Sequence, residues 1–136
     1  MSIRSNAAVI HTSANVATVL FAVVVVLQIL LALGILPISM AWGGRQSVLT
    51  PMLRLASLAS ALVLGLFAYV IRRRAGLAGP ADVSVLVRVL AWAATAYMAF
   101  NTVANLASQT RAERLVFTPI TLVLTVVCFI VSISRP

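Results

Sequence analysis

Four long apolar runs constrain this chain more than any other feature. They cover about residues 15–37, 52–71, 83–106 and 116–134. Each is close to the roughly 20 residues that an α-helix needs to cross about 30 Å of hydrocarbon. Backbone polar groups cannot stay unpaired in lipid, and barrel strands are about half this length and alternate in polarity. The predicted fold is therefore all-α, an integral membrane four-helix bundle in which residues 1–136 form a single domain.

Composition and charge support this class and argue against a nucleic-acid partner. The chain is 62% hydrophobic and 9% charged, whereas a soluble domain is about half apolar and about a quarter charged. The net charge is +8, but the ten basic residues lie at the ends of the apolar runs and form no basic face. All ten are arginine, and with the abundant Ala and Val this is typical of a GC-rich bacterium. We therefore expect a multi-pass protein of the bacterial cytoplasmic (inner) membrane.

The arginines also predict the orientation in that membrane. An even number of spans places both termini and the second connection on one side. That side carries Arg4, Arg72, Arg73, Arg74 and Arg135, with Arg88 just inside the third run. The other side carries Arg45, Arg111 and Arg114, with Arg54 just inside the second run. Because arginine is enriched on the cytoplasmic side, the N- and C-termini are predicted to be cytoplasmic.

Polar side chains within the runs gather at one depth, in the halves predicted to face outward. Gln28 lies in the first run, and Asn101, Asn105 and Ser108 share one helix face in the third through their i, i+4, i+7 spacing. This pattern predicts a polar cavity that opens outward. The alternative is that the amides only bond to neighbouring helices.

Charged and aromatic residues of the outer connections extend this candidate site. Arg54 either snorkels to lipid phosphate or pairs with Glu113. Arg111 and Arg114 flank that acid and would leave the site net positive, which favours an anionic ligand or lipid headgroup. Trp42 precedes two glycines and is expected to act as an interface anchor or as a lid over the cavity. The predicted ligand-binding residues are Gln28, Trp42, Arg54, Asn101, Asn105, Ser108, Arg111, Glu113 and Arg114.

Two stripes of small residues predict helix contacts. Ser57, Ala61 and Gly65 form the first, and Thr118, Thr121, Thr125, Cys128 and Ser132 form the second. One thin bundle does not need both stripes, so a homo-oligomer is expected, with a dimer favoured. Thr118 followed by Pro119 predicts the start of the fourth helix.

The residues that catalysis requires are scarce. His11 is the single histidine, and the two acids, Asp82 and Glu113, are expected on opposite membrane faces. No carboxylate pair, Ser-His-Asp set, metal cluster or phosphate-binding loop can be found, and no acid lies in a predicted span. We therefore expect neither an enzyme nor a bound metal or cofactor.

Three segments, "LALGILP", "AWGGRQSVLTPMLRLAS" and "NLASQTRAERLVFTPITLVL", resemble a family of small bacterial four-span proteins. In that family a Trp-Gly-Gly first loop and an Asn-Leu-(Ala/Ile)-Ser…Glu-Arg third loop recur. The resemblance covers most of the chain from Leu31 onward and implies the four-span fold but no activity. It adds weight to a set of residues in these loops, namely Trp42, Gly43, Gly44, Arg54, Asn105, Ser108, Glu113 and Arg114.

Two functions are consistent with these features. The first is a non-enzymatic protein that binds a small anionic or lipidic ligand in an outward-facing pocket, as a unit of a channel or transporter. The alternative is an accessory or assembly subunit that docks a larger membrane protein through its small-residue faces. The expected partners are membrane lipids, a second copy of the chain or that larger membrane protein.

Overall fold

The computed structural model describes residues 6–44, 47–80 and 82–134, and within these residues it is helical with no strand. The long helices are α1 (Ala7–Ala32), α2 (Pro51–Arg74), α3 (Val85–Leu106) and α4 (Thr118–Ser132). Two short 3-10 turns, η2 (Ile38–Met40) and η3 (Trp42–Gly44), lie between α1 and α2, and a π-helical turn, η4 (Glu113–Phe117), leads into α4. Four helices, the last counted from Glu113, are long and apolar enough to cross a membrane. The all-α, four-helix prediction is thus confirmed.

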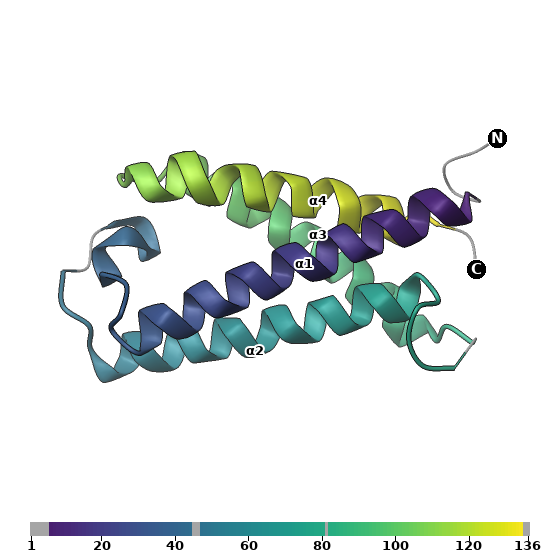
Figure 1. Ribbon diagram of the computed structural model, residues 1–136, viewed down its shortest axis with the longest axis horizontal. Coiled ribbons are helices and arrows are strands. Elements are labelled where there is room, and N and C mark those ends of the chain that lie inside the picture. The colour runs from purple at the N-terminus through teal and green to yellow at the C-terminus, as the bar shows by residue number, and fades with distance from the viewer. Residues whose placement is uncertain (1–5, 45–46, 81, 135–136) are drawn as a thin grey trace.

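The helices form an elongated bundle with two distinct ends (Figure 1). One end holds the start of α1, the end of α4 and the α2–α3 connection, and we call it the terminal end. The other holds the α1–α2 and α3–α4 connections, and we call it the distal end. α1 packs mainly on α2 and α3 on α4, while α1 and α4 join the two pairs.

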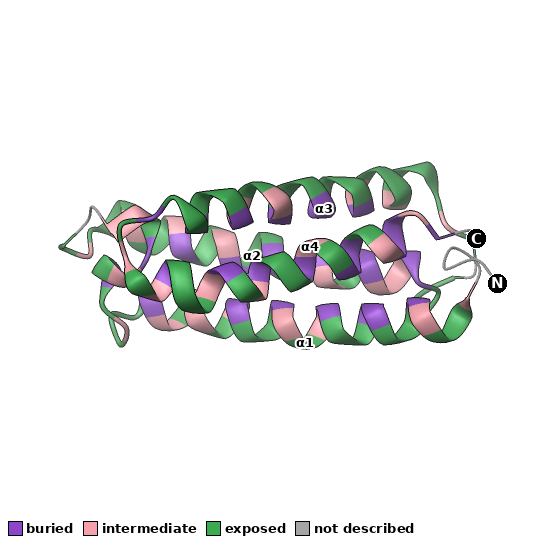
Figure 2. Ribbon diagram, turned by 90° about the horizontal axis from the view of Figure 1, so that it is seen from above, coloured by how far each residue is buried: buried purple, intermediate pink, exposed green. Residues whose placement is uncertain are grey.

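Buried residues follow the inward faces of the helices (Figure 2). Phe21, Met98 and Leu124 are almost fully buried, and alanines such as Ala17 and Ala94 let the helices approach closely. Large apolar side chains cover the outside, with Leu62 77% exposed. Such an apolar exterior is unsuited to water and matches the requirements of a lipid-facing surface.

The ends of the first helix differ from the prediction. It begins at Ala7 rather than near residue 15, because Asn6 accepts a hydrogen bond from the Val9 N–H (3.2 Å) and caps it. It ends at Ala32 rather than near residue 37, because the chain turns at Gly34, whose φ is +78°. Hydropathy locates apolar residues, whereas capping and turn residues set the ends of the helix.

Thr118 is the first residue of α4, as predicted, but it neither caps the helix nor begins the helical backbone. Helical backbone already begins at Arg111 and continues through η4. The Thr118 hydroxyl donates to the Glu113 carbonyl (3.0 Å) rather than capping α4. Pro119 has no N–H to donate, so the wider π turn before it lets the helix continue without that bond. Glu113 is therefore the first residue of the fourth candidate span, which differs from the expectation that no acid lies in a span.

The threonine stripe of α4 lies inside the bundle, against α3. Hydroxyl groups meet at Thr95 and Ser132 (3.1 Å) and at Thr102 and Thr125 (3.4 Å). The predicted helix–helix contact is therefore confirmed for this stripe, and its partner is a helix of the same chain.

The second stripe is only partly inside the bundle. Ser57 is fully buried and Ala61 is 8% exposed, whereas Gly65 faces outward. Both stripes therefore contribute to packing within one chain, and the expectation that the bundle does not need both is wrong. A dimer stays a prediction that rests only on the frequency of two-fold symmetry.

The arginine triplet that ends α2 ties the terminal end together. Arg72 donates to the side chains of Asn15 (3.0 Å) and Thr18 (3.2 Å) on α1. Arg73 donates to backbone carbonyls of the α2–α3 connection. Arg74 is buried and donates to carbonyls at the C-terminal end of α4, where the helix dipole favours a cation. These arginines therefore have structural partners in addition to any role in orientation.

Candidate functional site

Residues from all four helices line a cavity of about 370 Å³ in the distal half of the bundle. Apolar and aromatic side chains make up most of the lining. The lining residues are Val24, Gln28, Leu31, Ala41, Trp42, Gly43, Ser60, Leu64, Tyr97, Met98, Phe100, Asn101, Ala104, Asn105, Glu113, Phe117 and Thr121. A mainly apolar pocket with a few polar groups is the usual form of a small-molecule site.

Six of the nine predicted site residues belong to this cavity or support it. Gln28, Trp42, Asn101, Asn105 and Glu113 line it directly. Ser108 lies beside it and donates a hydrogen bond to Glu113. The structure thus brings together the predicted amides, the tryptophan and the acid, which come from α1, α3 and both distal connections.

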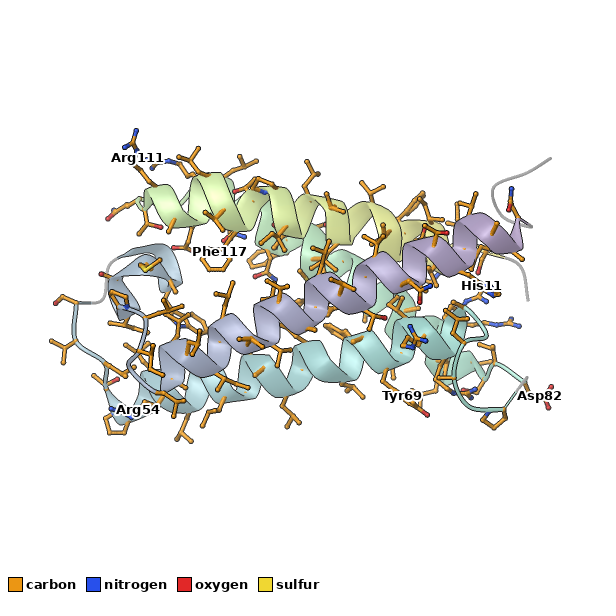
Figure 3. All side chains as sticks on the ribbon, viewed as in Figure 1. His11, Arg54, Tyr69, Asp82, Arg111 and Phe117 are labelled. Carbon is orange, nitrogen blue, oxygen red and sulfur yellow. The ribbon has the colours of Figure 1, made fainter. Side chains whose placement is uncertain are left out.

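The three predicted arginines do not line the cavity. Arg54 is exposed at the start of α2, and Arg111 extends away from the bundle (Figure 3). Arg114 donates to the backbone carbonyl of Ser108 (2.8 Å) and so braces the α3–α4 connection. Arg45 lies outside the described residues. The expected arginine-lined pocket is therefore absent from the part of the chain that the structure describes.

Glu113 is held by neutral donors instead of an arginine. Its side chain is 8% exposed, and Oε1 accepts from the Gly43 N–H (2.9 Å), the Ser108 hydroxyl (2.7 Å) and the Thr110 hydroxyl (3.4 Å). No ion pair joins Arg54 to Glu113 among the described residues. A buried carboxylate is stabilised by several such hydrogen bonds even without a counter-ion.

The Trp-Gly-Gly turn forms one wall of the cavity and depends on Glu113. Trp42, Gly43 and Gly44 all have left-handed backbone, with φ of 55°, 78° and 77°. The Trp42 Nε1–H donates to the buried Ser57 hydroxyl (3.4 Å). A Cβ at Gly44 would lie 2.3 Å from Cγ2 of Thr110, so the turn contacts the α3–α4 connection closely. The two loop motifs singled out in the sequence are thus one three-dimensional unit.

Two roles were expected for the amides, lining the cavity or bonding to a neighbouring helix, and the structure contains both. Asn105 lines the cavity and also donates from Nδ2 to the Thr121 hydroxyl on α4 (3.3 Å). Asn101 donates from Nδ2 to the Tyr97 carbonyl in its own helix (2.8 Å). Gln28 Oε1 is buried without a hydrogen-bond partner.

The aromatic lining of the cavity was not predicted from the sequence. Tyr97, Phe100 and Phe117 join Trp42 around the cavity, and Phe117 points from η4 into the bundle (Figure 3). Phe117 follows Glu113 by four residues, so a shared helix face could have indicated it. Aromatic residues in apolar runs are usually interpreted as lipid contacts, so the shared face of Glu113 and Phe117 was not used.

The cavity lining offers groups that can bind a ligand. Within the described residues no cluster of three or more His, Cys, Asp or Glu side chains could hold a metal. His11 and Asp82 lie at the terminal end, far from the cavity (Figure 3). One carboxylate, three amides and several aromatic rings can bind and orient a small molecule.

Comparison with models of known families, with curated proteins and with solved structures gave no match to this chain. The resemblance to small bacterial four-span proteins therefore stays a prediction.

Proposed function

We propose that this non-enzymatic protein spans a bacterial inner membrane four times and binds a small organic cation in the distal cavity. The N- and C-termini lie in the cytoplasm, and the cavity is reached from the outer side. One observation supports a positively charged ligand: Glu113 is the only charged side chain among the described residues that line the cavity.

A cation suits the rest of the lining as well. The volume, about 370 Å³, falls within the range for small-molecule pockets. A positive charge is attracted to the faces of aromatic rings, and Trp42 and Phe117 both line the site. A bound cation would also neutralise a carboxylate that the fold has removed from water. An amphipathic amine with one ring or short alkyl chain combines these properties.

The ligand expected from the arginine count has less support. Arg54, Arg111 and Arg114 would favour an anion, but none of them lines the cavity. An anionic or lipidic ligand at the outer rim, a channel or transporter unit, and an accessory subunit for a larger membrane protein stay predictions. No contact among the described residues favours any of these over cation binding.

The charge of the ligand can be tested with three molecules of similar shape. In lipid nanodiscs, isothermal titration calorimetry should show 2-phenylethylammonium binding at least about tenfold more tightly than 2-phenylethanol or 3-phenylpropanoate, which corresponds to about 1.4 kcal/mol. Glu113→Gln should remove that preference because it removes the charge and keeps the side-chain shape.

Asp82→Asn is the matched control, since it neutralises the other acid at the opposite end of the bundle. It should leave the preference unchanged. Tighter binding of the propanoate, or a preference unaffected by Glu113→Gln, would overturn cation binding at this site.

The proposed orientation has a separate test. Single cysteines replace Ser47, Gln109 or Asp82, all exposed, in a Cys128→Ala background. Asp82 represents the α2–α3 connection because Gly76 there has a φ of +79°, which a cysteine would strain. In intact cells an impermeant thiol reagent should label the cysteines at Ser47 and Gln109 but not that at Asp82. Labelling of Asp82 alone would invert the orientation.

A further inference from the structure

Resting on the proposed function, we infer that the ligand's charged group is a primary ammonium, or a similar cation rich in N–H donors, rather than a quaternary ammonium. The inference comes from the hydrogen bonds that the cavity's polar groups have already made. They leave acceptors unpaired on the residues that line it.

Asn101 contributes the first acceptor. Its amide nitrogen Nδ2 donates to the Tyr97 carbonyl at 2.8 Å. A carbonyl oxygen can only accept, so the nitrogen must be the atom on that side. The oxygen Oδ1 therefore remains an acceptor, and no described residue donates to it.

Asn105, one turn further along α3, contributes the second acceptor. Its contact is the Thr121 hydroxyl at 3.3 Å, and that hydroxyl already donates its hydrogen to the Phe117 carbonyl at 3.0 Å. The Thr121 oxygen must then accept, so Asn105 presents Nδ2 to it. Oδ1 of Asn105 is again left as an acceptor without a donor among the described residues.

Glu113 contributes the third acceptor. All three of its hydrogen bonds end on Oε1, and Oε2 has no donor in the described part of the chain. The indole N–H of Trp42, a donor at the cavity wall, is used by Ser57. Three oxygens of the lining, on Asn101, Asn105 and Glu113, therefore have no donor among the described residues.

Gln28, on helix α1, adds a fourth oxygen without a donor, and its Nε2 is likewise a donor without a partner among the described residues. Its side chain makes no hydrogen bond to a described residue, and Oε1 is buried. A buried amide oxygen normally has a partner, and a ligand with N–H donors would supply one.

A primary ammonium carries three N–H donors on one charged atom, and these can pair with the free oxygens of Glu113, Asn101 and Asn105. A quaternary ammonium carries the same charge but no donor, so it would leave these oxygens without the hydrogen bonds that a primary ammonium supplies. The apolar part of the ligand would then lie against Phe117, Phe100 and Leu64, which line the same cavity.

The test compares two cations of equal charge, 2-phenylethylammonium and its N,N,N-trimethyl derivative. Calorimetry in nanodiscs should give at least about tenfold tighter binding of the primary amine. Asn101→Leu should reduce this ratio several-fold, since its one hydrogen bond is to its own helix and its loss does not separate helices. Asn15→Leu, at the terminal end, should leave the ratio unchanged.

The outcomes separate the inference from the proposed function. Equal or tighter binding of the trimethyl compound overturns the inference and leaves cation binding intact. Binding of neither cation, with 2-phenylethanol or 3-phenylpropanoate bound, overturns the proposed function itself. If Asn101→Leu fails to fold, the ratio in the unmodified protein still decides the inference.

Discussion

Replacing Gly44 with alanine is expected to destabilise the protein clearly more than replacing Gly43. Both glycines have left-handed backbone, with φ of 77° and 78°, so alanine carries a similar strain of about 1–2 kcal/mol at either position. At Gly43 an added Cβ meets no atom within 4 Å, whereas at Gly44 it lies 2.3 Å from Cγ2 of Thr110. Relieving that overlap should add about 1–3 kcal/mol to the loss of unfolding free energy.

Thr110→Ser provides the rescue that identifies the cause. Serine lacks the Cγ2 methyl but keeps the hydroxyl that contacts Glu113 and accepts from its N–H. The Gly44→Ala, Thr110→Ser double variant should therefore return to the thermal midpoint of Gly43→Ala, followed by circular dichroism in one lipid composition. Equal midpoints for the two single variants would show that the Trp-Gly-Gly turn does not contact Thr110.

Much of the fold could be predicted from the sequence because lipid leaves few options. Apolar runs of this length must be helices, and the structure has four helices of that kind. The ends of the helices could not be predicted, because they depend on single hydrogen bonds and turn residues. Asn6 extends the first helix into a polar segment, and the π turn before Pro119 moves the start of the fourth.

The amide side chains of the candidate site could be predicted from the sequence, but the positions of its charged side chains could not. Helical periodicity places Asn101 and Asn105 on one face, and both line the cavity. It does not determine the direction of a long, flexible arginine such as Arg54, which is exposed. Nor does a sequence reveal that backbone and hydroxyl donors satisfy Glu113, because Gly43 lies 70 residues away along the chain.

Replacing Glu113 with alanine should cause the second large loss of stability, and Arg54 should not share in it. The variant leaves the Gly43 N–H and the Ser108 and Thr110 hydroxyls without their acceptor. Hydrogen bonds to a charged group contribute about 1.5–3 kcal/mol each, and water can replace part of them, so a total near 3 kcal/mol is expected. Glu113→Gln keeps an oxygen in place and should lose less than half of that.

The Trp-Gly-Gly turn should become mobile in the Glu113→Ala variant, and the fluorescence of Trp42 can detect this change. In a Trp92→Phe background, Glu113→Ala should shift the Trp42 fluorescence to longer wavelength as the indole leaves Ser57, its partner in the intact site. Glu113→Gln should shift it much less.

Replacing Arg54 distinguishes hydrogen bonding of Glu113 by neutral donors from an ion pair between Arg54 and Glu113. Because Arg54 is exposed and contacts no acid among the described residues, Arg54→Ala should change the unfolding free energy by less than about 0.5 kcal/mol. The Arg54→Ala, Glu113→Ala double variant should equal the sum of the single variants within about 0.5 kcal/mol, as for independent sites. A coupling above about 1 kcal/mol would mean that the two charges do pair, since only groups in contact couple so strongly. In that event the arginine, and not the Gly43 N–H, would be the main partner of the Glu113 side chain.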